Sequence, residues 1–350
     1  MRTRILALLF ALVVPTGSVA QSTGEWTFGT DPLADLWFHG LAVVGFDGFG
    51  RVPLYDADYA WDVARAQHGL DDEASELSQA RGRLLAAFSA DPAFEVLHFV
   101  PLYFSNAPVE VALDALADLS GARASSLDPA VVREARSVAA VLPEERQRAV
   151  LAEFVNLLRA ERAVVRELEA DAPVGSTLRS EWNDLTAIDE FRTFLEREGF
   201  PGGEVLVTPA LGPEGRFLST ARGPIVVVGP GESVEPSAVL GAVIRELCYP
   251  AVRRVLTPYE ARFQDRRTVS DVSDRAATRC GEMLVETHRP EWLTDYRVRF
   301  SLDPSGAGFL STHGFTPGVA VLERELDDAL RRELHLNDGS VRGEPRPAGR

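Results

Sequence analysis

Hydrophobic residues recur at helical spacing through most of the first half of the chain. Between residues 31 and 172 this spacing predicts helices over 32–38, 56–66, 74–88 and 143–170. In the last of these, apolar side chains recur every three or four residues along one side, as in an amphipathic helix packed on a core. We therefore expect a helical N-terminal lobe over residues 21–175, ending in the Pro- and Gly-containing segment 171–176.

Two short β-branched runs follow at 204–208 and 224–228, each bounded by Gly and Pro. Such runs are typical of strands, so a small β-sheet is expected there. Helical patterns occur around 189–197, from 236 to 247, over 276–286 and from 319 onwards. The fold class is therefore predicted to be α+β and mainly helical, with a second domain over 176–336 in which the sheet packs on these helices.

The most informative motif lies in the helix that follows the sheet. Arg245-Glu246-Leu247-Cys248-Tyr249 is similar to the H-E-x-x-H motif of zinc proteases, in which two histidines one helical turn apart bind zinc and the glutamate activates the metal-bound water. Here the acid is kept and both histidines are replaced. Arginine has no lone pair to offer, and a neutral tyrosine is a poor zinc ligand. The other interpretation is an ordinary helix with a surface Arg-Glu pair.

The surrounding residues strengthen the similarity. Residues 188–334 resemble the gluzincins, and more narrowly an uncharacterised family of secreted bacterial putative metallopeptidases. The elements that match are Pro250-Ala251-Val252 after the motif, Glu282-Met283-Leu284-Val285, and Gly314-Phe315 before a last helix. The resemblance implies a zincin-like domain in which Glu282 was the third zinc ligand, Glu246 is a remnant of the catalytic base, and His313 could have steadied the oxyanion. By itself, His313 is better explained as a turn residue.

The departure from the family lies at the catalytic positions themselves, Arg245 and Tyr249. We therefore expect no bound zinc or other cofactor, with Arg245 in the place of the metal as a counter-ion of Glu282. The predicted role is binding of a peptide or protein by a catalytically inactive homologue. The alternative is an active metal-dependent peptidase or hydrolase that holds its metal, zinc, in an unusual way and uses Glu246 as its base.

The chain has two cysteines, Cys248 and Cys280, one on each of the two helices that would carry such a site. A disulfide between them and two separate buried thiols are equally compatible with the pattern.

Composition and the chain ends indicate an exported protein. Arg2 and Arg4, an apolar run over 5–14 and Ser18-Val19-Ala20 predict a signal peptide over residues 1–20. Secretion or a periplasmic location follows, without membrane insertion. The formal net charge of −16 argues against a nucleic-acid partner. Residues 337–350 lack periodicity and are predicted to be a disordered tail.

Overall fold

The computed structural model describes most of the chain, and the ranges with defined placement are 24–47, 54–56, 58–69, 75–105, 107–119, 128–171, 174, 177, 185–220, 223–230, 235–263, 266–302 and 319–336. The predicted signal peptide, the predicted tail and His313 lie outside these ranges.

Contacts divide the chain into two compact units, which are described separately below. Unit 1 consists of Met1–Asp189 and Phe200–Glu246, and unit 2 of Glu190–Gly199 and Leu247–Arg350. This division differs from the boundary expected near residue 175, because the sheet groups with the N-terminal helices. The physical reason is that one strand of the sheet comes from the start of the chain and the sheet shares its core with the helical lobe.

The sheet of unit 1 has four strands in the order β1-β2-β4-β3. They are β1 Trp26–Gly29, β2 Gly203–Val207, β3 Arg216–Thr220 and β4 Gly223–Val228. β1, β2 and β4 are parallel, whereas β3 is an antiparallel edge strand paired with β4. The two β-branched runs thus form β2 and β4, as expected. β1 and β3 were not expected, because they are short and mix polar with apolar residues.

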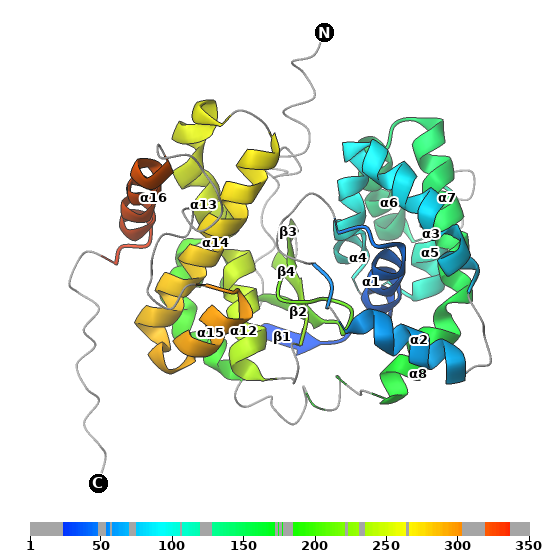
Figure 1. Cartoon of the computed structure of the whole chain (residues 1–350), viewed down its shortest axis with the longest axis horizontal. Coiled ribbons are helices and arrows are strands. Elements are labelled where there is room, and N and C mark those ends of the chain that lie inside the picture. The colour runs from blue at the N-terminus through cyan, green and yellow to red at the C-terminus, as the bar shows by residue number, and fades with distance from the viewer. Residues whose placement is uncertain are drawn as a thin grey trace. The chain divides into compact units, whose positions relative to one another are not determined.

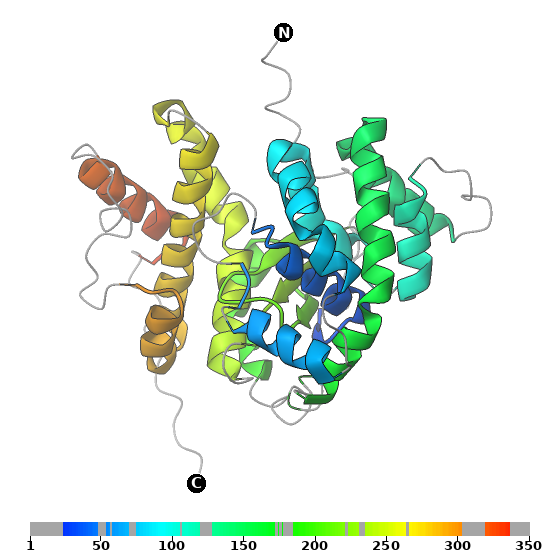
Figure 2. The ribbon, with the colours of Figure 1, turned by 45° about the vertical axis from the view of Figure 1, so that its right-hand side comes forward.

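The helices of unit 1 cover both faces of this sheet. Residues Leu206, Leu218, Ile225 and Val227 join one hydrophobic core with the N-terminal helices. The alternate residues of β2 and β4 are also buried and face the opposite side. Figures 1 and 2 show α1 and α12 on opposite sides of the sheet. The helices are α1 Pro32–Val44, α2 Tyr59–Gly69, α3 Glu76–Ala90, η1 Pro92–Phe99, α4 Val100–Tyr103, α5 Val109–Ala117, α6 Pro129–Val141, α7 Glu145–Ala160, α8 Arg162–Asp171 and α12 Pro236–Leu247, while η3 Thr186–Phe191 runs into unit 2.

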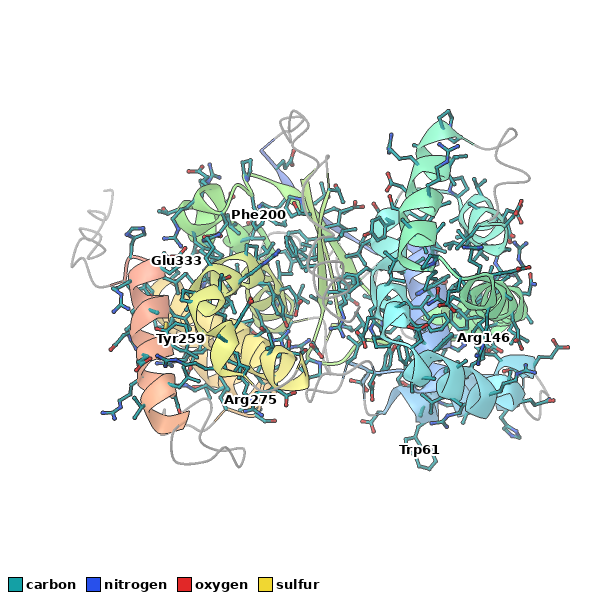
Figure 3. All side chains as sticks on the ribbon, turned by 90° about the horizontal axis from the view of Figure 1, so that it is seen from above. Trp61, Arg146, Phe200, Tyr259, Arg275 and Glu333 are labelled. Atoms are coloured by element: carbon teal, nitrogen blue, oxygen red, sulfur yellow. A yellow bond between two sulfur atoms is a disulfide. The ribbon has the colours of Figure 1, made fainter. Side chains whose placement is uncertain are left out.

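Local sequence explains where several of these helices begin and end. The Asp31 carboxylate accepts a 2.8 Å hydrogen bond from the Ala34 N–H at the start of α1, and Pro32 suits the first turn. Gly45 ends α1 in the left-handed conformation, with φ of 79°. In contrast, α2 is peripheral, and its Trp61 is 75 % exposed and points away from the ribbon (Figure 3).

The single helix predicted over 143–170 is interrupted at Glu161, which separates α7 from α8. The Glu161 side chain is fully buried and lies 3.1 Å from His39 Nε2 on α1. His39 Nδ1 lies 3.0 Å from the hydroxyl of Tyr59, so three polar side chains meet inside the helical lobe. Hydrophobic spacing alone does not reveal such a polar contact between helices.

Unit 2 is helical over its described residues. Its long helix α14, Arg266–His288, contacts α13, η5, α15 and α16. The other elements are α11 Arg192–Arg197, α13 Tyr249–Leu256, η4 Thr257–Arg262, η5 Pro290–Trp292, α15 Leu293–Arg299 and α16 Val319–Glu333. The predicted class, α+β and mainly helical, is confirmed. Within the described residues, no helix combines the length and the apolar character that a membrane crossing requires.

Candidate functional site

The five-residue motif is divided between two helices. Arg245 and Glu246 lie in the last turn of α12, whereas Tyr249 begins α13 after a turn residue at Cys248. Pro250 explains the break, because it has no N–H to donate and its ring crowds the carbonyl four residues earlier. The expectation of one continuous motif helix is therefore wrong.

The acid of the motif is buried. Glu246 is 1 % exposed and Arg245 is completely buried. Arg245 Nη1 donates a hydrogen bond to Glu246 Oε1, and the N–H of Gly215 donates to the same oxygen at 3.2 Å. The interpretation of Arg245 and Glu246 as a solvated surface pair is therefore wrong.

Glu214 and Arg216 are two further charged residues beside this pair. We call Glu214, Gly215, Arg216, Arg245 and Glu246 the Glu246 cluster. The Glu214 carboxylate lies 3.2 Å from Arg216 Nη1 and 3.7 Å from Arg245 Nη2. Arg216 also donates a 2.7 Å hydrogen bond to the carbonyl of Gly215. The cluster thus joins the entry to the edge strand β3 with the end of α12.

A glycine is required where these two elements meet. A Cβ atom on Gly215 would lie 2.5 Å from the carbonyl oxygen of Val227 and 3.0 Å from Cγ of Glu246. Both distances are shorter than ordinary van der Waals contact. The absence of a side chain at 215 therefore allows the backbone N–H to reach the Glu246 carboxylate.

Burial raises the pKa of Glu246 above its ordinary value. The positive charge of Arg245 acts in the opposite direction, Glu214 raises the pKa further, and Arg216 and the Gly215 N–H lower it. The balance follows from desolvation, which disfavours the charged carboxylate more than one close guanidinium favours it. A carboxyl group of this kind could accept a proton, but 1 % exposure leaves a substrate almost no access to it.

The other two predicted site residues lie in unit 2, where each has its own partners. The hydroxyl of Tyr249 donates a 2.7 Å hydrogen bond to Asp274 Oδ1. Glu282, which is 4 % exposed, accepts hydrogen bonds from Arg279 at 2.5 Å and from Arg297 at 2.6 Å. The counter-ions of Glu282 are therefore these two arginines, in place of the expected Arg245.

A disulfide joins Cys248 and Cys280, whose Cα atoms are 6.1 Å apart. It links the turn before α13 to the long helix α14 within unit 2. In the sequence, Cys248 directly precedes Tyr249, and Cys280 lies two residues before Glu282.

Sequence reasoning missed Glu214, Gly215 and Arg216. The available signal was a Gly-Pro-Glu-Gly-Arg run at 212–216 between two expected strands, which a turn alone would explain. Among the described residues, no group of three His, Cys, Asp or Glu side chains is arranged to hold a metal ion.

Comparisons with protein-family models, with curated proteins and with solved structures find no match to this chain.

Proposed function

We propose that the chain is an exported, catalytically inactive relative of the gluzincins that acts by binding a peptide or protein segment. The proposal combines the sequence resemblance with the burial and hydrogen bonds of Arg245, Glu246, Tyr249 and Glu282. Export rests on the predicted signal peptide, and the place of action would be the periplasm or the outside of the cell.

One observation carries the loss of catalysis: the Glu246 carboxylate is buried and held by Arg245 and Gly215. A metallopeptidase base must reach a metal-bound water. Here the Arg245 guanidinium is hydrogen-bonded to that carboxylate, and Tyr249 and Glu282 are hydrogen-bonded to other residues. Each of these groups would have to be released before a metal could bind.

The outer edge of β3 supports peptide binding. β3 is one of the two outer strands of the sheet, no other described strand pairs with its outer edge, and Ser219 on it is exposed. Ser219 is opposite Pro224, which has no N–H, so this pair lacks the reciprocal hydrogen bonds of its neighbours. By alternation, the backbone groups of Phe217 and Ser219 point away from β4. An extended peptide could add to this edge as a further strand.

The loss of catalysis is tested by elemental analysis of the purified mature protein together with a cleavage assay on fluorescein-labelled casein. We expect much less than one zinc per chain and no cleavage, even after incubation with added zinc. Near-equimolar zinc that a chelator removes, together with chelator-sensitive cleavage, would show that the alternative of an active metallopeptidase is right.

The binding role is tested by passing a peptide digest of an unrelated protein over immobilised protein and identifying retained peptides by mass spectrometry. Ser219→Pro removes one outward N–H and leaves the ladder to β4 intact, whereas Ser219→Ala keeps the N–H and serves as the matched control. We expect Ser219→Pro to abolish retention and Ser219→Ala to keep it. Equal retention by both variants would rule out strand addition at β3.

A further inference from the structure

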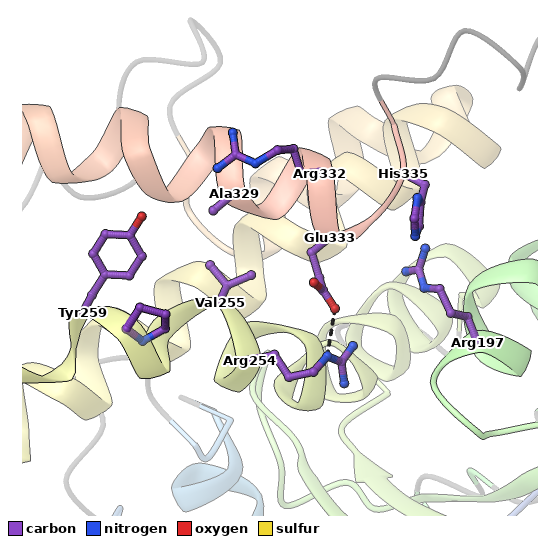
Figure 4. Close-up of a pocket in the computed structure, with 9 residues that line it drawn as sticks. Arg197, Arg254, Val255, Tyr259, Ala329, Arg332, Glu333 and His335 are labelled. Carbon is purple, nitrogen blue, oxygen red and sulfur yellow. Dashed lines mark hydrogen bonds and ion pairs between the residues drawn. The ribbon is translucent and has the colours of Figure 1, made fainter.

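Unit 2 contains a cavity of about 630 Å³ between α13, η4 and α16 (Figure 4). This volume is in the range of small-molecule sites. Val255, Pro258 and Tyr259 form an apolar side, and Arg197, Arg332 and His335 are among the polar residues that line the cavity. A mixture of apolar surface and a few polar groups is what small organic ligands require.

The charge of this cavity is opposite to that of the chain. The chain carries a formal net charge of −16, but arginines outnumber acids in the lining by three to one. The one acid, Glu333, is 2.8 Å from Arg254, and Arg254 also makes two hydrogen bonds to Glu198. Both acids therefore bind Arg254. Arg197 Nε lies 3.5 Å from Glu198, and the Arg197 guanidinium lies 5.6 Å from the centre of the Phe194 ring. No described residue forms an ion pair with Arg332.

His335 contributes an independent observation. Its φ of 56° lies in the left-handed region, where glycine is the usual residue after a helix. The turn closes α16 through a 3.0 Å hydrogen bond from the Leu336 N–H to the carbonyl of Arg331. Figure 4 shows the His335 ring and the Arg197 guanidinium at the same end of the cavity. A histidine in this conformation carries more backbone strain than a glycine would, and the turn places its side chain at the cavity.

We propose that this cavity binds a small organic carboxylate. The carboxylate lies between Arg197 and His335, where two N–H donors converge, and the apolar part of the ligand covers Val255 and Tyr259. This inference does not depend on the proposed peptide-binding edge, which belongs to unit 1.

Calorimetric titration of the full mature chain with three probes tests the proposal. 4-Phenylbutyrate carries both the charge and an apolar body, 4-phenylbutanol lacks the charge, and inorganic phosphate lacks the apolar body. We expect measurable binding of phenylbutyrate, at least about ten-fold weaker binding of the alcohol, and no binding of phosphate. Equal binding of acid and alcohol, binding of phosphate alone, or no binding of any probe would overturn the proposal.

Variants locate the site. Arg197→Gln and His335→Gly should each weaken phenylbutyrate binding at least about ten-fold, and the glycine at 335 suits the left-handed turn, so this variant should fold. Arg289→Gln is the matched control, because Arg289 belongs to the same unit and pairs with Glu190 and Glu291, and none of these three residues lines the cavity. Full binding by both site variants, or an equal loss in the control, would place the ligand elsewhere.

Discussion

Glu246 in unit 1 and Glu282 in unit 2 are both almost completely buried, but their surroundings differ. Glu246 uses one oxygen, Oε1, for both of its described donors, and Oε2 of the neighbouring Glu214 has no hydrogen-bond partner among the described residues. Glu282 instead has a different arginine on each oxygen. The second arrangement continues through Arg279 to Asp327 and Arg331, and we call these five residues, Arg279, Glu282, Arg297, Asp327 and Arg331, the Arg279 network.

The pKa shifts of Glu246 and of Asp327 in the Arg279 network have opposite directions. Burial raises the pKa of Glu246 despite Arg245. At Asp327 burial also acts to raise the pKa, but the hydrogen bonds and charges of Arg279 and Arg331 outweigh it, and the pKa is lowered. Asp327 is 25 % exposed, whereas Glu246 is enclosed. Asp327 thus combines two arginine partners with partial exposure to water, and both favour its charged form, whereas Glu246 is desolvated and has one arginine partner.

The largest expected effect is at Arg245. Arg245→Met should reduce the free energy of unfolding by about 3–5 kcal/mol, because Glu246 and Glu214 would lose a buried counter-ion. Urea denaturation at pH 7 measures the change. The double variant Arg245→Met with Glu246→Gln should lose less than the single variant, because one stranded charge is removed. A single variant within about 0.5 kcal/mol of the parent would show that the cluster is more hydrated than its burial indicates.

The disulfide should rank next. Replacing both Cys248 and Cys280 by alanine opens a loop with a sequence separation of 32. Loop-closure entropy then predicts a loss of about 3–4 kcal/mol. Because both cysteines belong to unit 2, thermal unfolding measured by scanning calorimetry should show a lower transition temperature for that unit. The parent protein under reducing conditions is the control and should behave like the double variant. An unchanged transition in both would contradict the prediction.

The sequence was a good guide where local pattern dominates. The strands β2 and β4, and helices such as α1 and α3, follow from β-branched runs, amphipathic spacing and caps such as Asp31. The interruption before α13 was not predicted, although Pro250 carries the signal, because a proline cannot continue a hydrogen-bonded helix.

Long-range pairings were not predictable in the same way. Gly215 meets Glu246 only because an antiparallel edge strand returns beside the end of α12. β1 pairs with a strand that lies far away in sequence, and nothing local in Trp26–Gly29 indicates its partner. The same holds for the arginines that bind Glu282, because every face of a charged helix offers such candidates.

Asp35 on α1 extends the comparison to a buried acid for which no arginine is among the described partners. Burial raises its pKa to about 8, Thr208 lowers it by a hydrogen bond, and Glu169 and Asp31 raise it further. The native state thus keeps a proton that the unfolded chain releases near the ordinary value of 3.8. The proton on Asp35 therefore makes its full contribution to the free energy of unfolding below about pH 4. This contribution is lost as the pH rises through about 8.

Asp35→Asn should remove this pH dependence and increase the free energy of unfolding at pH 8.5 by about 1–2 kcal/mol. The gain is limited because the buried amide must itself be hydrogen-bonded. Urea denaturation of parent and variant from pH 5 to 8.5 measures the effect. A parent whose stability rises over this range, with no difference from the variant, would contradict the assignment.

The smallest effect is expected at Arg262, whose side chain is 57 % exposed and lies 2.8 Å from Glu325, itself 40 % exposed. Water screens this pair and both side chains lose entropy in forming it, so Arg262→Ala should change the free energy of unfolding by less than about 0.5 kcal/mol. Arg279→Ala is the matched test in the same unit, because it leaves Glu282 and Asp327 with one arginine each, and its cost should be clearly larger. Urea denaturation at low and high salt measures both. If the two variants lost equal stability at both salt concentrations, burial and donor number would not be what distinguishes the ion pairs of this protein.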